Sequence, residues 1–164
     1  MNVYKTDDIR NVVLLGHGSA GKTTLVEGMA LLGGIVSRMG TVNGKNTVSD
    51  FDKEEQNRGF SMSATVLPIE WNKKKINIID TPGYFDFVGE AEQGLSAADG
   101  AIIVVNAKAG VQTGAIKAWE MCEKANKPRM IFVTGMDLAD VDYNAVIEDL
   151  FGGWKANVYE LLPN

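Results

Sequence analysis

Hydrophobic runs and segments of helical period alternate along most of the 164-residue chain. Aliphatic runs predict three buried strands, at residues 12–16, 101–107 and 129–134. Apolar positions three or four residues apart predict four helices, at residues 22–32, 87–97, 111–125 and 143–150. Strands that alternate with helices of this length form a mostly parallel sheet with helices on both faces. The pattern therefore predicts an α/β fold, and the length fits a single domain over residues 1–164.

A second kind of pattern lies between the first two strand–helix units. Residues 63–71 and KINIID (75–80) predict strands, and the polar tip NKKK between them predicts an antiparallel hairpin. Pro68 lies inside the first of these strands, and proline cannot donate a hydrogen bond to a neighbouring strand. The hairpin is therefore expected at one edge of the sheet.

Residues 33–59 are rich in Gly, Asn, Asp and Ser and show weak periodicity. They predict a long loop, and a loop of this length inside a compact domain is usually functional or mobile. Its acidic residues are interpreted as a solvated stretch: Asp50, Asp52, Glu54 and Glu55. RGFSMSA (58–64) closes the loop, and its Ser61 hydroxyl is a candidate ligand that would complete magnesium coordination when a third phosphate is present.

The segment GHGSAGKTT (16–24) follows the first predicted strand and opens the first predicted helix. It matches G-x-x-x-x-G-K-[ST], the phosphate-binding loop of P-loop proteins. Gly16 and Gly21 allow the main chain to turn its N–H groups toward phosphates at the positive end of the helix. Lys22 is expected to reach the terminal phosphates, and the Thr23 hydroxyl is expected to bind magnesium. The sequence therefore predicts a P-loop NTPase fold.

IIDTPGYFDF (78–87) begins in the second hairpin strand. Asp80 ends that strand, where a carboxylate in P-loop proteins holds magnesium through water. Gly83 follows Pro82, and its N–H group is expected to contact a terminal phosphate. An Asp-Thr-Pro-Gly turn on its own is also common in ordinary loops. Its place after the hairpin, downstream of the phosphate loop, favours the functional interpretation.

Together with FVTGMD (132–137), these motifs stand in the order and spacing of the translational GTPases. Along almost its whole length the chain resembles the N-terminal G domain of an elongation factor G-like protein. The resemblance implies that GTP is the nucleotide, that Mg²⁺ is the cofactor, and that GTP is hydrolysed to GDP and phosphate on the ribosome. Without the ribosome, turnover is expected to be slow.

The same resemblance implies roles for individual residues. The expected nucleotide-binding set is Gly16, His17, Gly18, Ser19, Ala20, Gly21, Lys22, Thr23, Thr24, Asp80, Thr81, Pro82, Gly83, Tyr84, Thr134, Gly135, Met136 and Asp137. The expected metal ligands are Thr23, Ser61 and Asp80, and the expected catalytic residues are Lys22, Gly83 and Tyr84. His17, the only histidine, is interpreted as a structural residue near the phosphates.

Several residues expected beside the third phosphate of GTP depart from the family pattern. Tyr84 replaces the histidine that orients the attacking water, and a phenol, whose pKa is near 10, is a poor base at pH 7. Positioning water needs only a hydrogen bond, which a phenol can provide. Gly18 replaces a bulkier apolar residue, and we expect it to make room for Tyr84; Phe60 replaces Ile. Tyr84 and Ser61 are typical of an elongation factor G-like side group.

The base-reading motif departs further, because TGMD (134–137) stands where relatives have Asn-Lys-Met-Asp. Asp137 retains the carboxylate that accepts hydrogen bonds from the guanine edge. Gly135 has no alkyl stem to lie over the base, and Thr134 is shorter than Asn. Guanine recognition is therefore expected to persist but to be weaker by a few kcal/mol.

Composition narrows the class of protein. The formal net charge of −5 argues against a general nucleic-acid-binding surface, and no DNA partner is expected. No apolar run approaches the roughly 20 residues of a membrane span, so no membrane association is expected. Cys122 is the only cysteine, which excludes an internal disulfide and favours a cytoplasmic location.

Two other functions fit the same motifs. One is a ribosome-protection GTPase of the tetracycline-resistance type, which shares these G-domain motifs. The other is a nucleotide-sensing interaction module with little or no turnover, which Tyr84 and TGMD favour. An ATP-using P-loop enzyme is disfavoured by Asp137 and by the family resemblance.

The C-terminal part of the sequence predicts an incomplete G domain. Relatives continue with a strand that bears a Ser-Ala motif and with a last helix, and residues 151–164 are too few for both. The strand at 129–134 would then have an unpaired outer edge, which favours self-association of this fragment.

Overall fold

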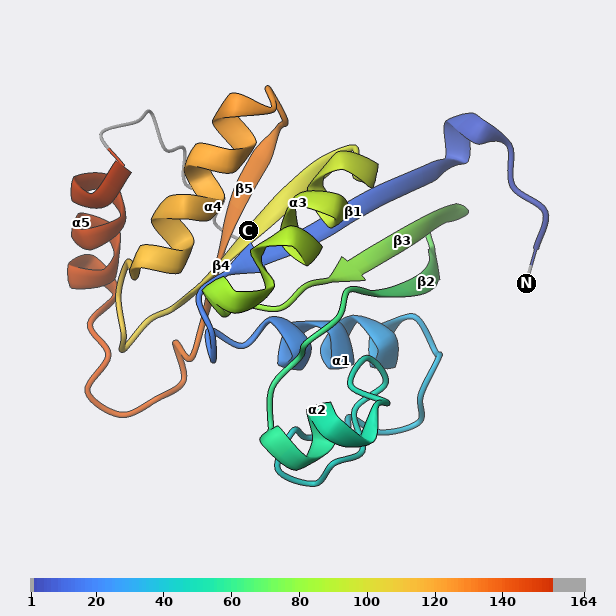
Figure 1. Ribbon diagram of the computed structural model, residues 1–164, viewed down its shortest axis with the longest axis horizontal. Helices are drawn as coiled ribbons and strands as arrows, with labels where there is room; N and C mark the ends of the chain where they lie inside the picture. Colours follow the sequence, from blue (N-terminus) through green and yellow to red (C-terminus); the bar gives the residue numbers. More distant parts are fainter. Residues whose placement is uncertain (1, 155–164) are drawn as a thin grey trace.

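The computed structural model describes residues 2–154 (Figure 1). These residues form the strands β1 (Ile9–Gly16), β2 (Thr65–Trp71), β3 (Lys74–Asp80), β4 (Gly100–Asn106) and β5 (Arg129–Thr134). The α-helices are α1 (Lys22–Leu32), α2 (Lys53–Arg58), α3 (Val88–Ala97), α4 (Thr113–Lys124) and α5 (Tyr143–Trp154). Short 3-10 turns cover Thr6–Asp8 and Phe85–Phe87.

The five strands form one sheet in the order β2-β3-β1-β4-β5. β1 pairs in parallel with β3 and β4, and β4 pairs in parallel with β5. β2 runs antiparallel to β3 and lies at the edge, with Pro68 opposite Asn77. The predicted α/β fold, with a mostly parallel sheet and one antiparallel edge hairpin, is confirmed.

Helices cover both faces of the sheet, as Figure 1 shows with α1 on one side and α3 and α4 on the other. Side chains alternate along a strand, so β1 sends Leu14 toward the α1 layer and Val13 and Leu15 toward the α3–α4 layer. All three side chains are almost fully buried. A strand buried on both faces needs an unbroken hydrophobic run, and this explains why NVVLL has no polar residue after Asn11.

Residues 33–59, predicted to be a loop throughout, contain the helix α2. The Asp52 side chain begins this helix by accepting a hydrogen bond from the Glu54 N–H group at 2.7 Å. Gly59 ends it in a left-handed conformation with φ +73°. The helix sequence KEEQNR has no apolar period, so the hydrophobic pattern could not show it. The cap residues at its two ends are the signal that the prediction missed.

β5 is the outermost strand opposite the hairpin. Its Met130 and Phe132 side chains are exposed, and its outer edge pairs with no strand within residues 2–154. The expected self-association through this edge stays a prediction. The expected shortage of chain for a further strand and helix concerns residues that lie mostly outside the described part. No helix between residues 2 and 154 is long and apolar enough to span a membrane.

Candidate nucleotide-binding site

The phosphate loop connects β1 to α1, and its main chain requires glycine at both ends. Gly16 has φ +139°, and a side chain there would collide with the main chain of Val104 in β4. Gly21 has φ +97° and is the N-cap residue of α1. The loop therefore ends at a helix N-terminus, where unpaired N–H groups and the helix dipole favour an anion.

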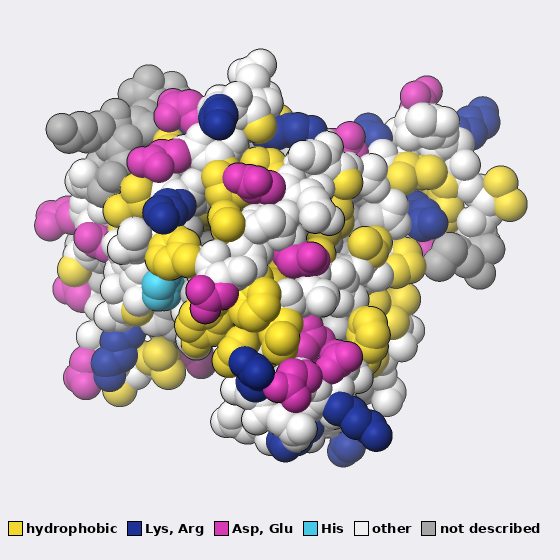
Figure 2. All heavy atoms as spheres, in the orientation of Figure 1, with side chains coloured by type: hydrophobic (Ala, Val, Ile, Leu, Met, Phe, Trp, Pro, Cys, Tyr) yellow, Lys and Arg dark blue, Asp and Glu magenta, His cyan; other side chains and the backbone are white. Residues whose placement is uncertain are grey.

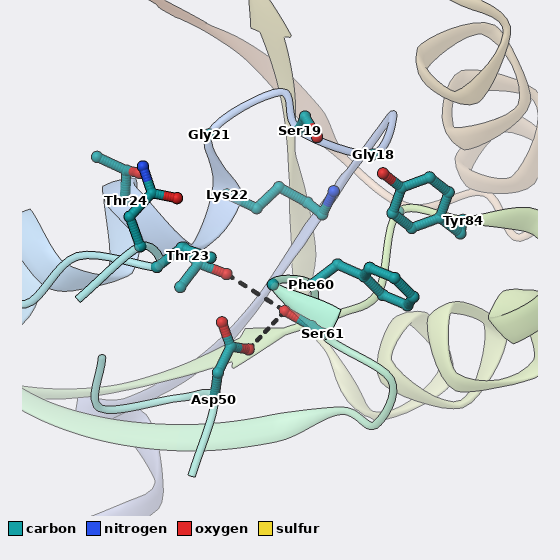
Figure 3. Close-up of a pocket in the computed structure, with 14 residues that line it drawn as sticks. Gly18, Ser19, Gly21, Lys22, Thr23, Thr24, Asp50, Phe60, Ser61 and Tyr84 are labelled. Carbon is teal, nitrogen blue, oxygen red and sulfur yellow. Dashed lines mark hydrogen bonds between the residues drawn. The ribbon is translucent and has the colours of Figure 1, made fainter. Parts of the chain in front are cut away.

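Lys22 begins α1 and lies along the cleft toward Gly18, as Figure 3 shows. Its ammonium group donates to the main-chain carbonyls of His17 at 2.8 Å and Gly16 at 3.2 Å. The side chain is buried, and this desolvation lowers the pKa of Lys22 to about 8, partly opposed by the nearby Asp80 carboxylate. Lys22 therefore supplies a poorly solvated cation that gains from a phosphate partner.

A chain of hydroxyls and carboxylates lies beside the phosphate loop. Thr23 donates to Asp80 Oδ2 at 3.0 Å, and Ser61 donates to Asp50 Oδ1 at 2.7 Å. The Thr23 and Ser61 hydroxyls are 3.3 Å apart (Figure 3). The three residues expected to bind the metal are thus brought together from α1, from the end of β3 and from the segment before β2. Asp50 joins them and was not among the expected ligands.

Asp80 is only 2% exposed at the end of β3. Burial raises its pKa to about 6, although the Ser49 hydroxyl, the hydrogen bond from Thr23 and the charge of Lys22 oppose the rise. Its second oxygen, Oδ1, is buried without a hydrogen-bond partner among the described residues. The next residue, Thr81, is fully buried and donates to the Leu14 carbonyl at 2.6 Å, which fixes the chain where it leaves the sheet.

The interpretation of the acidic residues as a solvated stretch is wrong for Asp50 and Glu55, which are each 4% exposed. Glu55 Oε1 accepts the N–H groups of Met62 at 2.8 Å and Ser63 at 3.0 Å. These main-chain donors satisfy the carboxylate, so it can be buried. Asp52 and Glu54 are exposed, as expected.

Glu27 of α1 is a third buried carboxylate, 1% exposed, that sequence reasoning missed. Its oxygens accept the N–H groups of Gly40 at 2.6 Å and Val48 at 2.5 Å. Glu27 thereby holds both ends of the segment 40–48 against α1. No signal in the sequence marks it, since a glutamate inside a helix is ordinarily solvent-exposed.

The Tyr84 ring lies against Gly18, as expected. A Cβ atom at Gly18 would come within 2.8 Å of Tyr84 Cζ, so even alanine would displace the ring. On its other side, Tyr84 contacts Phe60 with ring centroids 4.8 Å apart (Figure 3). Three of the positions that depart from the family pattern therefore pack together.

The neighbouring surface is apolar. Tyr84, Phe85 and Val88 are exposed, and Figure 2 shows hydrophobic side chains gathered around the start of α3 with acidic side chains beside them. The Lys117 ammonium group lies 4.1 Å from the Phe85 ring centre. His17 meets the same ring edge-on at 6.4 Å between centroids, and its buried Nδ1 has no partner among the described residues. This packing agrees with a structural role for His17.

A cleft of about 270 Å³ runs along the phosphate loop. Its lining residues are Gly18, Ser19, Gly21, Lys22, Thr23, Thr24, Val42, Asn43, Asp50, Gly59, Phe60, Ser61, Gly83 and Tyr84. Val42 and Asn43 come from the segment held by Glu27 and were not expected in the site. Gly83 is pressed against Lys22 and the main chain of Gly18, and Pro82 beside it is buried.

The base-reading residues lie outside this cleft, since none of residues 134–137 lines it. Thr134 instead donates to the Ala20 carbonyl at 2.6 Å and so ties the end of β5 to the phosphate loop. Gly135 has φ +72°, and a Cβ atom there would be 3.1 Å from Leu138 Cδ1. Met136 and Asp137 are exposed. The contact of each of these residues with a nucleotide stays a prediction.

The sequence model of the elongation factor Tu GTP binding domain matches residues 7–159. The chain belongs to this family. It is 42% identical over 145 residues to the mitochondrial ribosome-releasing factor 2 of Drosophila willistoni, and the match covers 88% of this chain and 20% of that protein. The chain spans about a fifth of the length of the curated relatives that it matches.

Two solved structures share the fold. A protein from Thermus thermophilus is 40% identical with a TM-score of 0.84, and the match covers 88% of this chain and 22% of that one. A bacterial selenocysteine-specific elongation factor is 26% identical with a TM-score of 0.68, covering 86% and 22% of the respective chains. The resemblance to the G domains of translational GTPases and the P-loop fold are thereby confirmed.

Proposed function

We propose that residues 1–164 act as the GTP-binding and GTP-hydrolysing domain of an elongation factor G-like translation factor, with Mg²⁺ as cofactor and the ribosome as partner. The observation that carries the proposal is the pair of hydroxyls from Thr23 and Ser61, 3.3 Å apart between the phosphate loop and the buried Asp80. Family membership supports GTP as the nucleotide.

The residues present fit a magnesium ion. Mg²⁺ takes oxygen ligands at 2.0–2.1 Å in octahedral geometry, so its neighbouring ligands lie roughly 3 Å apart. The two hydroxyls meet that spacing, and the unpartnered Asp80 Oδ1 is available to a metal-bound water. Within residues 2–154 no three His, Cys, Asp or Glu side chains are grouped to hold a metal. The remaining ligands would therefore be water and phosphate oxygens, as is usual for Mg²⁺.

Each expected catalytic residue has a role that fits its position. Lys22 neutralises charge on the terminal phosphates, where its own burial makes the gain large. Gly83 itself lies next to Lys22. Its N–H group contacts the third phosphate in this proposal, and this contact is lost when that phosphate leaves. Tyr84 orients the attacking water through its hydroxyl, on the side of the cleft near Gly18. The bound Mg²⁺ supplies stabilisation of charge on the phosphate oxygens.

Intrinsic hydrolysis is slow in this proposal, and the ribosome accelerates it. A phosphoryl-transfer site needs its water positioned and its charge stabilised, and in related GTPases a partner provides part of both. A relative named ribosome-releasing factor 2 and one named as an elongation factor support the ribosome as that partner.

One experiment tests the proposal as a whole. The chain is titrated with fluorescent GTP, GDP and ATP analogues with and without Mg²⁺, and phosphate release is then followed with and without ribosomes. We expect Mg²⁺-dependent binding that favours GTP over ATP, and release that ribosomes accelerate. Absence of nucleotide binding would contradict the proposal.

The same experiment separates two alternatives. Tyr84 and the TGMD motif at residues 134–137 favour a nucleotide-sensing module, which would bind GTP and release no phosphate even with ribosomes. A ribosome-protection factor would hydrolyse GTP and would also displace tetracycline from ribosomes when tested within its full-length protein.

A further inference from the structure

We propose that Asp50 is a positioning residue for the magnesium site: its carboxylate accepts a hydrogen bond from the Ser61 hydroxyl and so turns the oxygen lone pairs of Ser61 toward the cation. This inference rests on the proposed function, because it assigns Asp50 a role in the same metal site.

The geometry pairs each ligand hydroxyl with its own buried carboxylate. Thr23 donates to Asp80 at 3.0 Å, and Ser61 donates to Asp50 at 2.7 Å. Asp50 is 4% exposed and Asp80 is 2% exposed, so water competes little for either bond. The two hydroxyl oxygens then face each other at 3.3 Å, which is where a shared cation would bind them.

The chemistry of a bound hydroxyl requires such an acceptor. A serine or threonine that ligates a cation keeps its proton, and this proton must point away from the metal. The metal also withdraws electron density from the oxygen, which strengthens a hydrogen bond donated to a carboxylate. Groups that orient a ligand in this way commonly change metal affinity by about 10- to 100-fold when they are removed.

Serine needs this help more than threonine does. A β-branched side chain is restricted at χ1 by its second substituent, whereas serine rotates more freely. At Ser61, where relatives carry threonine, the bond to Asp50 supplies the restriction that the missing methyl group would give. The inference therefore links a departure from the family pattern to a specific neighbour.

Asp50 can act in this way because its own segment is held in place. Glu27 accepts the Val48 N–H group at 2.5 Å, and the Thr65 hydroxyl donates to the Ser49 carbonyl at 3.0 Å. The Gln56 side chain donates to the Asp50 carbonyl at 3.2 Å. Asp50 is thus anchored on α1, α2 and β2 rather than on a free loop.

The test measures Mg²⁺ dependence of nucleotide release from the full chain. Dissociation of a fluorescent non-hydrolysable GTP analogue and of a fluorescent GDP is followed over a range of Mg²⁺ concentrations. For Asp50→Ala we expect the Mg²⁺ concentration for half-maximal retention of the GTP analogue to rise about 10- to 100-fold. Asp50→Asn should show a smaller rise, because the amide oxygen of asparagine still accepts a hydrogen bond from Ser61.

GDP retention should change less than about threefold in both variants, because Ser61 is proposed to join the metal only with a third phosphate. A general loss of structure would instead raise the Mg²⁺ requirement for both nucleotides. Glu54→Gln serves as the matched control, since Glu54 is an exposed acidic residue in the same stretch, and it should behave like the parent.

A double-mutant cycle with Ser61→Ala separates positioning from simple attraction between charges. If Asp50 acts through Ser61, Asp50→Ala adds nothing to the effect of Ser61→Ala. If the two effects multiply, Asp50 attracts the cation independently and the inference is overturned. An Asp50→Ala variant that retains the GTP analogue like the parent also overturns it while leaving the proposed function intact. A parent chain without Mg²⁺-dependent retention contradicts the proposed function itself.

Discussion

The phosphate side and the base side of the site are organised by different means. On the phosphate side, residues from α1, from residues 50–61 and from the end of β3 converge, and their polar groups contact one another over 2.7–3.3 Å. On the base side, residues 134–137 begin at the last residue of a single strand, do not line the cleft, and include a left-handed glycine. Only Thr134 is tied to the phosphate loop.

This difference indicates that the phosphate side contributes most of the binding free energy. Charged and hydroxyl groups on the phosphate side are already desolvated, so a magnesium–phosphate group gains strong interactions without first ordering the protein. The base side offers fewer fixed contacts. Nucleotide affinity should therefore depend far more on the phosphates than on the identity of the base, and substitutions on the two sides should differ in size.

The largest effect is expected from Lys22→Ala. Removing a charge-assisted contact of about 3 kcal/mol should weaken binding of GTP and GDP about 100-fold. Lys73→Ala, at the exposed tip of the hairpin, is the matched control and should bind like the parent. Fluorescence titration measures the affinities, and circular dichroism checks the fold. A Lys22→Ala chain that is folded and binds normally would show that the phosphate side is not the source of affinity.

The next effect concerns Tyr84 and its contact with Gly18. Gly18→Ala places a methyl group 2.8 Å from Tyr84 Cζ, so the ring must move. We expect ribosome-stimulated turnover to fall about tenfold, because a displaced hydroxyl positions water poorly. In a Tyr84→His background the same change should do less harm, since the shorter ring leaves room. Equal damage in both backgrounds would exclude steric coupling.

Several elements and contacts of the structure could be predicted from the sequence. The bounds predicted for α1 and β5 agree with the structure, because strong periodicity and strand composition decide them locally. The contact between Gly18 and Tyr84 followed from two departures that compensate in volume. The three expected metal-site residues also meet: Thr23 lies in the first turn of α1, Asp80 ends β3, and Ser61 lies in the segment before β2.

The sequence could not predict the buried carboxylates, because their burial depends on hydrogen-bond partners outside the local pattern. Glu27, Asp50 and Glu55 are buried because N–H or hydroxyl groups outside their own turn of chain, 7 to 13 residues further on, satisfy them. Hydrophobic patterning treats any acidic residue as exposed. It cannot identify a buried carboxylate that accepts hydrogen bonds from a loop. For the same reason the sequence did not predict that Val42 and Asn43 line the cleft, since Glu27 holds their segment there.

A smaller effect is expected on stability, again on the phosphate side. The pKa of Asp80 is raised to about 6, so the ionised carboxylate destabilises the fold at pH 7. Asp80→Asn removes this buried charge and should therefore raise the free energy of unfolding by about 1 kcal/mol. The gain is no larger because Lys22 loses the opposite charge beside it. This advantage should shrink as the pH falls through 6, because the native carboxyl then takes up a proton before the unfolded one does. Urea unfolding at pH 7.5 and 4.5 measures both values, and an equal difference at the two pH values would contradict the assignment.

The smallest effect is expected on the base side, from Gly135→Lys, which restores the residue of relatives. Gly135 has φ +72°, so both Gly135→Lys and Gly135→Ala should lower the free energy of unfolding by about 1 kcal/mol. Only the lysine variant should bind nucleotide more tightly, about fourfold, as its stem buries roughly one methylene against the base. An alkyl stem packs over either base, so the ratio of GTP to ATP affinity should stay unchanged while Asp137 reads the guanine edge. Titration of GTP and ATP against both variants measures these affinities. A gain of about 100-fold, or a changed ratio, would show that the base side matters as much as the phosphate side, and the contrast between them would fail.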